Sequence, residues 1–447
     1  MSTPTMSTTT KKPKAPPRPV ETLKKQSPEP FVARIPGSKS YTNRALVLAA
    51  MRTGTTQVTG GLDCEDTQRL AAALASFEGL SVTQTEDGFR VERTQDVLGA
   101  PARELHMGAA GTPARFMLAF AGSARGATVV TGTPRLCERP MGDILATLRA
   151  IGIRCECLGK EGCLPVRVHG GTPTSRTWRI AGGVSSQFTS SLLLYASQQP
   201  KGEPVRLQIE GHQVSRPYVE MTRAMMKECG ITTAREGESV IVVTPGAPKV
   251  ATIPVEVDAS GMSYFLAAAA VTGTTVEIPG IGAGSAQGDV GLAKAFERMG
   301  CTLELGARSI RITGGALKGI DIDMETMPDV VLTLAVVAAR AKGTTRITNI
   351  ANLRVKECDR IHAAAAELGR LGVKVEEGED FLVIHPSGTL TPAEIHTYDD
   401  HRVAMAFGIL GLVQPDITIE DPDCVAKSFP GFWQELVRFT RHHNGGF

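Results

Sequence analysis

Hydrophobic and polar residues alternate in a pattern that recurs along the chain after Phe31. Each copy has a helical stretch, a glycine, and two short alternating strands joined by a turn. The glycines are Gly79, Gly152, Gly230, Gly300 and Gly372, spaced 73, 78, 70 and 72 residues apart. A glycine in this position predicts that the residue after each helix adopts the left-handed backbone conformation. Five copies predict a sixth, divided between a strand near residues 31–36 and a helix at 432–441.

Each period also contains a second helical stretch that is rich in small residues. These stretches are residues 44–51, 113–121, 186–197, 262–272, 330–341 and 401–412. Alanine and glycine allow such helices to pack closely against a sheet or against each other. The repeating unit is therefore βαβαββ. We predict an α/β (α+β) fold with two domains, each made of three such repeats around buried helices.

The first thirty residues differ from the rest of the chain. They are rich in Pro, Ser, Thr and Lys, and they carry six basic and two acidic side chains. This composition predicts a disordered tail over residues 1–30. The tail has no apolar segment typical of a secretory signal, and an organelle transit peptide stays an alternative.

Composition and charge exclude several classes of protein. The longest apolar runs are too short to span a membrane. The net charge of +2 arises from the tail, so the body lacks the basic excess of a nucleic-acid-binding protein. The nine cysteines have no C-x-x-C spacing, which argues against a zinc site or a disulfide framework. We expect a cytoplasmic protein with reduced thiols and no metal.

Polar and basic side chains gather where four of the small-residue helices are predicted to begin. The groups are Lys39, Ser40 and Arg44; Gly111, Thr112 and Arg115; Ser185, Ser186 and Gln187; and Asp400, His401 and Arg402. Backbone N–H groups and the helix dipole make such a start suitable for an anion. Any one of them could be an ordinary helix cap beside a solvated arginine. Four together indicate that the protein binds phosphate or carboxylate groups.

Two motifs of nucleotide-binding proteins are absent. The segment GSKS at 37–40 is similar to part of a P-loop, but it lacks the G-x-x-x-x-G-K spacing. The glycines of PGIGAGSAQGD do not have the spacing of a dinucleotide fingerprint.

Three further segments carry candidate functional side chains. In NLRVKECDR, a helix from about Lys356 would place Lys356 and Arg360 on one face, with Glu357 adjacent to that face. Asp329 precedes an apolar helix, and Lys427 lies in a loop near the C-terminal helix. The structural alternatives are a surface helix with ion pairs for the first segment and a plain N-cap for Asp329.

Taken in order, these motifs resemble the 5-enolpyruvylshikimate-3-phosphate synthase family over residues 31–436. The matching motifs are PGSKSYTNR, GAAGTPAR, CERPMGDIL, SSQF, VSRPY, SYFLAAAA, MPDVV, NLRVKECDR, DDHRVAM and AKSFPGF. The resemblance implies two domains of three βαβαββ units, between which the chain crosses twice. The upper domain would be 38–256, and the lower domain 31–37 plus 257–447.

The resemblance implies transfer of the enolpyruvyl group of phosphoenolpyruvate to the 5-hydroxyl of shikimate 3-phosphate, with release of phosphate and without a cofactor. It implies a monomer with these two small molecules as its partners, and no binding to nucleic acid or membrane. Shikimate 3-phosphate would be held by Lys39, Ser40, Arg44, Ser185, Ser186, Gln187, Ser215, Tyr218, Asp329, Asn352 and Lys356. Phosphoenolpyruvate would be held by Lys39, Gly111, Arg139, Gln187, Arg360, Arg402 and Lys427.

The resemblance also implies the catalytic residues. Glu357 would protonate C3 of phosphoenolpyruvate and later take a proton back, while Asp329 would accept the hydroxyl proton. Lys39 and Lys427 would assist. A carboxylic acid that acts near neutral pH needs a raised pKa, whereas neighbouring cations lower it.

The chain departs from the family pattern beside the phosphoenolpyruvate pocket. The family usually has Asn at the position of Ala109, Ala at that of Pro113, and a larger residue than Ala114. These differences put the response to the inhibitor glyphosate in doubt. Two rival functions stay open: the sister transferase acting on a UDP-amino sugar, for which Cys137 would be the reactive cysteine, and a non-catalytic homologue that only binds ligands.

Overall fold

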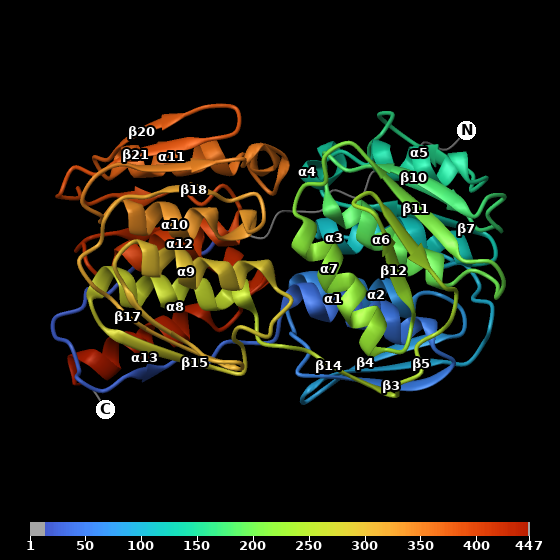
Figure 1. Cartoon of the computed structure of the whole chain (residues 1–447), viewed down its shortest axis with the longest axis horizontal. Helices are drawn as coiled ribbons and strands as arrows, with labels where there is room; N and C mark the ends of the chain where they lie inside the picture. The colour runs from blue at the N-terminus through green and yellow to red at the C-terminus, as the bar shows by residue number, and fades with distance from the viewer. Residues whose placement is uncertain (1–13, 446–447) are drawn as a thin grey trace.

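The computed structural model describes residues 14–445, which form two lobes side by side (Figure 1). The upper lobe, on the right in Figure 1, has a hydrophobic core that runs from Tyr41 to Ile253. The lower lobe has a core that combines Phe31 with residues from Ala259 to Phe439.

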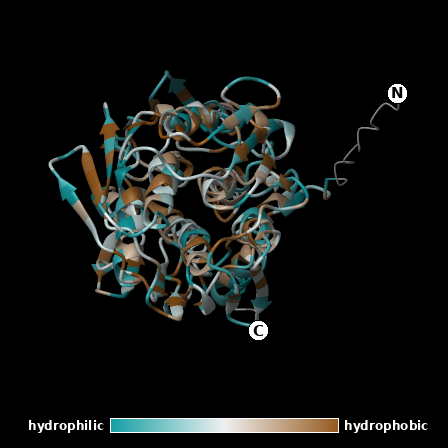
Figure 2. Ribbon diagram, turned by 90° about the vertical axis from the view of Figure 1, so that its right-hand side faces the viewer, coloured by the Kyte–Doolittle hydropathy of each residue, from teal (hydrophilic) through white to brown (hydrophobic). Residues whose placement is uncertain are grey.

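The helices rich in small residues form the centre of each lobe. They are α1 (Lys39–Met51), α3 (Gly111–Phe120) and α6 (Ser186–Ser197) in the upper lobe, and α8 (Ala259–Thr272), α10 (Val331–Ala338) and α12 (His401–Leu410) in the lower lobe. Almost every residue of these helices is buried, as expected for helices that are apolar on all sides. Figure 2 looks at the upper lobe from its side, where helices run through the middle and strands lie around them.

A second set of helices lies further out, and the predicted glycines follow them. These helices are α2 (Glu65–Ala75), α5 (Gly142–Ala150), α7 (Arg216–Glu228), α9 (Gly291–Arg298) and α11 (Arg360–Arg370), with the short α4 (Pro134–Glu138) and the C-terminal α13 (Phe432–Asn444). The glycines Gly79, Gly152, Gly230, Gly300 and Gly372 have φ values of 90°, 91°, 80°, 113° and 82°. The prediction of a left-handed residue after each helix is therefore confirmed.

Three four-stranded sheets surround the upper helices. Their strand orders are β14 (Thr252–Pro254), β3 (Gly54–Thr59), β5 (Gly88–Arg93), β4 (Leu80–Thr85); β6 (Leu105–His106), β7 (Ala127–Thr131), β9 (Val166–His169), β8 (Cys155–Cys157); and β10 (Thr177–Ala181), β11 (Val205–Glu210), β13 (Val240–Val243), β12 (Thr233–Glu236). In each sheet the first pair is parallel and the others are antiparallel. This arrangement agrees with a βαβαββ unit.

The lower lobe has three sheets of the same kind, and one of them is smaller. Their orders are β2 (Phe31–Val32), β15 (Thr275–Pro279), β17 (Ser309–Thr313), β16 (Thr302–Leu305); β18 (Asp321–Asp323), β19 (Thr345–Thr348), β21 (Leu382–His385), β20 (Lys374–Glu377); and β1 (Arg18–Pro19), β23 (Thr418–Ile419), β22 (Glu394–Ile395). Short 3-10 helices η1 (Ala121–Ser123), η2 (Gly288–Val290), η3 (Pro328–Val330), η4 (Ala351–Val355) and η5 (Pro422–Lys427) complete the fold.

The division of the sixth repeat was predicted incorrectly. The strand expected at 31–36 exists as β2, but it pairs in parallel with β15 and belongs to the fourth repeat. The sixth repeat instead takes β1, which pairs antiparallel with β23. An edge position suits this strand because Pro19 has no N–H to donate to a neighbour.

The expectation of disorder is wrong for residues 14–30, and residues 1–13 lie outside the described part of the chain. Val20 is buried in the lower core, and Arg18 stacks over the ring of Trp433. The backbone N–H groups of Lys24 and Lys25 donate to the side chain of Asn444 at 2.8 and 3.2 Å. Composition indicated disorder, but a few specific contacts to the lower lobe order the segment.

The two connections between the lobes lie next to each other. Ser38 N–H donates to Glu256 O at 2.7 Å, and Asp258 N–H donates to Pro36 O at 2.9 Å. Gly37 lies between them, and a Cβ on it would lie 1.9 Å from Gly60 O, so only glycine fits. With the two cores, these crossings support the boundaries 38–256 and 31–37 plus 257–447, which we propose for the domains.

Candidate active site

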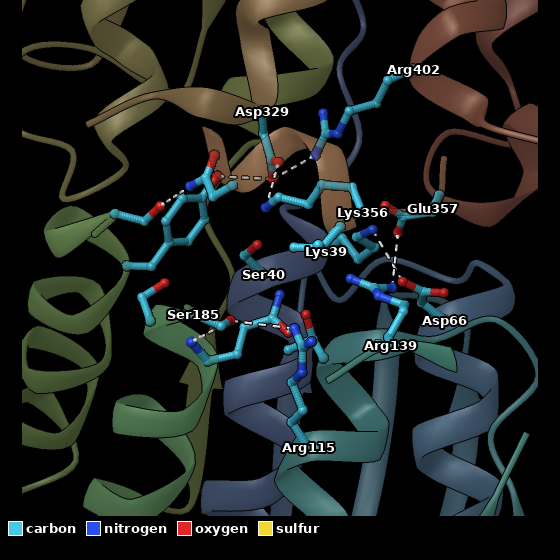
Figure 3. A pocket seen from close by; sticks show the side chains of 18 of the residues that line it. Lys39, Ser40, Asp66, Arg115, Arg139, Ser185, Asp329, Lys356, Glu357 and Arg402 are labelled. Carbon is cyan, nitrogen blue, oxygen red and sulfur yellow. Dashed lines mark hydrogen bonds and ion pairs between the residues drawn. The ribbon is translucent and has the colours of Figure 1, made fainter. Parts of the chain in front are cut away.

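A pocket lies between the lobes, where helices α1, α3, α6 and α12 begin (Figure 3). Its empty space is about 810 Å³, with the open mouth included. The lining residues are Lys39, Ser40, Arg44, Asp66, Gly111, Thr112, Arg115, Arg139, Val184, Ser185, Ser186, Gln187, Ser215, Tyr218, Asp329, Asn352, Val355, Lys356, Glu357, Arg360, His401 and Arg402. The pocket is therefore shared between the two lobes and strongly cationic.

On the upper lobe, the side chains at the helix starts are held by short polar contacts. Lys39 forms an ion pair with Asp66 at 3.1 Å. Burial lowers the pKa of Lys39, but Asp66 and Glu357 together outweigh burial, so that the pKa is raised. Arg115 Nη1 donates to Gln187 Oε1 at 2.7 Å and to Ser185 Oγ at 3.3 Å. The first contact joins the starts of α1 and α2, and the second joins the starts of α3 and α6, on the upper side of the pocket.

Arg44 lines the pocket, but it bonds mainly within the upper lobe. Its guanidinium donates to Thr222 Oγ1 at 2.7 Å, to Ser40 O at 2.9 Å and to Tyr218 O at 3.1 Å. Arg44 therefore supports Ser40 and Tyr218 from behind.

Gly111 and Arg139 fit closely against each other. A Cβ on Gly111 would lie 2.5 Å from Arg139 Nη1 and 2.8 Å from its Cζ. Because Gly111 has no side chain, the Arg139 guanidinium can pack directly against the start of α3. Arg139 is 4% exposed, lines the pocket, and places its Nη1 3.8 Å from the Glu357 carboxylate.

On the lower lobe, Asp329 is surrounded by cations. Its carboxylate accepts from Arg402 at 3.0 Å, from Arg360 at 3.2 Å and from Lys356 at 3.4 Å. The hydroxyl of Tyr218, from the upper lobe, donates to it at 3.1 Å. Burial would raise the pKa of Asp329, but the cations outweigh burial and hold the pKa well below its ordinary value.

Glu357 occupies a similar cage of positive charge. Its carboxylate accepts from Lys427 Nζ and Arg360 Nη2, each at 3.0 Å, and lies 3.8 Å from Arg139 Nη1. Burial raises its pKa, yet Lys427, Arg360 and Arg139 lower it further, so the pKa lies well below the ordinary value. The cations prevail at Glu357.

Lys427 does not line the pocket but lies directly behind Glu357. It is at the end of η5, and its Nζ also donates to Ala109 O of the upper lobe at 3.1 Å. Asn352 forms a further bond between the lobes, since its Nδ2 donates to Ser215 Oγ at 3.1 Å. The predicted site residues thus form one cluster, with Lys427 as the only one outside the lining.

The helix expected from about Lys356 begins later. Residues 351–355 form η4, α11 starts at Arg360, and Lys356 and Glu357 lie between them in neither helix. Lys356 has φ −84° and ψ −154°, an extended conformation. Lys356 and Arg360 still meet, because both reach the same oxygen, Oδ1 of Asp329.

Several lining residues were not among the predicted site residues. They are Asp66, Thr112, Arg115, Val184, Val355 and His401. Thr112, Arg115 and His401 belong to the helix-start motifs, so the sequence did indicate that they lie near the site. No sequence motif pointed to Asp66, at the start of α2, because only the folded chain brings it next to Lys39.

His401 is fully buried at the start of α12. Neither ring nitrogen has a hydrogen-bond partner among the described residues. Burial, together with Lys39 and Arg402, holds its pKa well below the ordinary value. His401 is therefore neutral and adds no charge to the cluster.

Asp289 is a further buried carboxylate close to the pocket. Ser260 donates to it, and the hydroxyl of Tyr218 lies 3.4 Å from its Oδ2. Burial, and then the nearby charge of Asp329, raises the pKa of Asp289 to about 7. Its protonation therefore changes within the physiological range of pH.

Neither a metal-binding cluster nor a long apolar helix is found in the part of the chain that the structure describes. Among residues 14–445, no group of three or more His, Cys, Asp or Glu side chains is placed to hold a metal ion. None of the helices in this range is long and apolar enough to cross a membrane.

Known proteins resemble this chain over nearly its whole length. The 3-phosphoshikimate 1-carboxyvinyltransferase of Vibrio atlanticus is 42% identical over 408 residues, which cover 90% of this chain and 95% of that protein. Its counterpart from Klebsiella pneumoniae (strain ATCC 700721 / MGH 78578) is 41% identical over 416 residues, with 91% and 95% covered.

Solved structures have the same fold. EPSP synthase from Acinetobacter baumannii matches with a TM-score of 0.77 and 29% identity, covering 94% of this chain and 97% of that one. The enolpyruvyl transferase NikO from Streptomyces tendae matches with a TM-score of 0.72 at 16% identity, covering 95% and 98%, and this likeness supports the fold alone.

The family model for EPSP synthase matches residues 28–436, which is close to the range 31–436 predicted from the motifs. With the relatives above, this match favours the shikimate enzyme over the UDP-amino sugar transferase and the binding-only homologue. The chain belongs to the EPSP synthase (3-phosphoshikimate 1-carboxyvinyltransferase) family, and it is an enolpyruvyl transferase of the shikimate pathway.

Proposed function

We propose that the pocket between the lobes binds shikimate 3-phosphate and phosphoenolpyruvate together and joins them. Both molecules carry a phosphate and a carboxylate, so their binding requires many cations in one place. The residues proposed for shikimate 3-phosphate are Lys39, Ser40, Arg44, Ser185, Ser186, Gln187, Ser215, Tyr218, Asp329, Asn352 and Lys356, and all of them line the pocket.

Phosphoenolpyruvate takes the side of the pocket where Arg139 faces the lower lobe. The proposed residues are Lys39, Gly111, Arg139, Gln187, Arg360, Arg402 and Lys427. The close fit of Gly111 against Arg139 supports a second anion subsite there. Lys427 lies outside the lining, and we include it because its Nζ is 3.0 Å from the Glu357 carboxylate, which faces this subsite.

In the addition step, the 5-hydroxyl oxygen bonds to C2 of phosphoenolpyruvate while C3 gains a proton from Glu357. Asp329 accepts the proton of the hydroxyl group. In the elimination step, Glu357 takes a proton from the new methyl group, the double bond forms again, and the bond to phosphate breaks. The proton on Asp329 leaves with the phosphate, so both carboxylates return to their first state. Lys39 and Lys427 stabilise the phosphate charge.

Substrate binding would raise the pKa of Glu357, so that this carboxylate takes up a proton from water before the addition step. Without substrate, Lys427, Arg360 and Arg139 keep its pKa low. The phosphate and carboxylate of phosphoenolpyruvate would bind to these same cations and neutralise much of their field. The pKa of Glu357 would then rise, because burial still disfavours its charged form. Glu357 would thus change from a proton acceptor into a donor when the substrate arrives.

The observation that carries this proposal is that Arg360 binds both carboxylates. It donates to Asp329 at 3.2 Å and to Glu357 at 3.0 Å, while Tyr218 and Arg139 reach these two groups from the other lobe. One pair of acid–base groups therefore faces one anion-binding surface. We also propose that the enzyme acts as a cytoplasmic monomer, in keeping with nine cysteines that are all free.

The test is phosphate release by the purified protein with both substrates and with each omitted in turn. We expect release only when both are present. A parallel reaction offers a UDP-amino sugar in place of shikimate 3-phosphate. Release with that acceptor alone, or binding of both shikimate 3-phosphate and phosphoenolpyruvate without release, would overturn the proposal.

A further inference from the structure

Arg135 of the upper lobe reaches across to the segment that carries Lys356 and Glu357. It lies in α4, and its Nε donates to Glu357 O at 3.1 Å while its Nη2 donates to Lys356 O at 3.2 Å. The third guanidinium nitrogen, Nη1, forms an ion pair with Glu138 at 3.2 Å in the same helix. One planar group thus holds two consecutive carbonyl groups of the opposite lobe.

These two carbonyl groups belong to a segment without regular structure. Residues 356–359 lie between the end of η4 and the start of α11. Helix or sheet bonds therefore do not fix the peptide between Lys356 and Glu357, although both side chains point into the pocket (Figure 3). The fork of Arg135 supplies the missing constraint, because its geometry fixes direction as well as distance.

The same short segment also contacts the side chain of Glu357. Arg139, at the end of α4, lies 3.8 Å from the Glu357 carboxylate, while Arg135 holds the Glu357 backbone. Residues 135–139 therefore contact Glu357 at two points, and both contacts cross between the lobes. Each contact requires the lobes to be close together.

We propose that Arg135 is a positioning residue that fixes Glu357 and Lys356 when the lobes close. This inference rests on the proposed function, since it assumes that Glu357 transfers the proton. Arg135 touches neither substrate in this scheme and does not line the pocket. It acts through the backbone of the segment that carries the acid.

Two variants of the same helix separate this role from a structural one. Arg135→Met removes the bonds to the carbonyl groups, and Glu138→Gln removes only the ion pair within α4. The side chains are 46% and 65% exposed, so both variants are expected to fold with nearly unchanged melting temperatures. We expect Arg135→Met to lower kcat by about ten- to a hundredfold, since small misplacements of a catalytic group have effects of this size. Glu138→Gln is expected to keep the kcat of the unchanged enzyme.

A double-mutant cycle with Glu357→Gln tests whether Arg135 acts through Glu357. If it does, Arg135→Met changes single-turnover rates by less than about threefold in the Glu357→Gln background. Arg135→Lys, which keeps the charge but not the fork, is expected to recover only part of the rate.

The proposal is overturned if Arg135→Met leaves kcat unchanged, or if Glu138→Gln lowers kcat as much as Arg135→Met does. It is also overturned if the double variant loses rate by the product of the two single losses, since Arg135 and Glu357 would then act independently. These outcomes require that the unchanged enzyme releases phosphate from both substrates. If that enzyme is inactive, the proposed function fails instead, so the two failures are distinguishable.

Discussion

The upper lobe meets the pocket mainly with residues at the starts of its helices, whereas the lower lobe meets it with a network of opposite charges. The upper side offers hydroxyl, amide and cationic groups, and Asp66 is its only carboxylate in the lining. On the lower side, Asp329, Glu357 and Asp400 all accept from Arg360, and Asp289 lies close to them. The two sides of the pocket thus differ in chemistry: the upper side presents mainly hydrogen-bond donors, and the lower side presents carboxylates that share the same cation.

The strongest test of this difference is removal of the acid from the lower lobe. Glu357→Gln is expected to lower kcat by about 10²- to 10⁴-fold, the usual contribution of a general acid–base group. Affinity for shikimate 3-phosphate is expected to change little, because most of its proposed partners lie on the upper lobe. Stopped-flow turnover and calorimetric titration measure the two effects. A loss of affinity equal to the loss of turnover would contradict the division between lobes.

The second test uses the dependence of stability on pH. Asp289 has a folded pKa of about 7, above its ordinary value of 3.8, so the folded state binds its proton more tightly than the unfolded state. This stabilisation is complete below pH 3.8 and is lost as the pH rises towards 7. Asp289→Asn removes the titration, so relative to the unchanged enzyme it is expected to gain roughly 2–3 kcal/mol between pH 5 and pH 8.

Urea unfolding of both proteins at pH 5, 6, 7 and 8 measures this difference. Asp66→Asn, on the upper lobe, is the matched comparison, because it removes a carboxylate that is paired with Lys39. Parallel stability curves for Asp289→Asn and the unchanged enzyme would show that Asp289 does not titrate in this range.

A smaller effect is expected where the lobes meet at Arg139. Gly111→Ala places a Cβ 2.5 Å from Arg139 Nη1, so the guanidinium must move. We expect the KM for phosphoenolpyruvate to rise about tenfold, equivalent to about 1.4 kcal/mol. The KM for shikimate 3-phosphate is expected to stay within a factor of two. Equal increases in both KM values would show that the two subsites are not separate.

The smallest effect is expected from a neutral donor of the upper lobe. Gln187→Ala removes one polar partner of Arg115 and one proposed contact to each substrate. A neutral hydrogen bond contributes about 1 kcal/mol, so the KM for shikimate 3-phosphate should rise about fivefold while kcat is kept. Steady-state kinetics measure kcat and the KM for shikimate 3-phosphate separately. A fall in kcat larger than the rise in KM would show that Gln187 takes part in the chemical steps.

The sequence predicted what local chemistry determines. The helix predicted at 186–197 has these same bounds in the structure. It begins at Ser186 because the side chain of Ser185 caps its first turn. The five glycines adopt the backbone conformation that their positions required. Most of the site was also predictable, since Lys39, Ser186 and Arg402 lie in recognisable helix-start motifs.

Long-range contacts determine what the sequence did not predict. Nothing local indicated that β1 would pair with a strand about four hundred residues away, or that Asn444 would bind Lys24 and Lys25. The partnership of Asp66 with Lys39, and of Arg135 with two carbonyl groups, likewise exists only in the folded chain. The charge spacing predicts a helix at Lys356, but the backbone there is extended, and Lys356 pairs with Asp329 from that conformation.

The crossing at Gly37 and Val257 limits how the enzyme can open. Because Ser38 and Asp258 bond the two connecting segments to each other, the segments must bend as one ribbon. We expect this pair of segments to act as a hinge, because the two hydrogen bonds oppose sliding of one segment past the other. A closure of the lobes about this hinge would return the residues on the two sides of the pocket to the same relative positions.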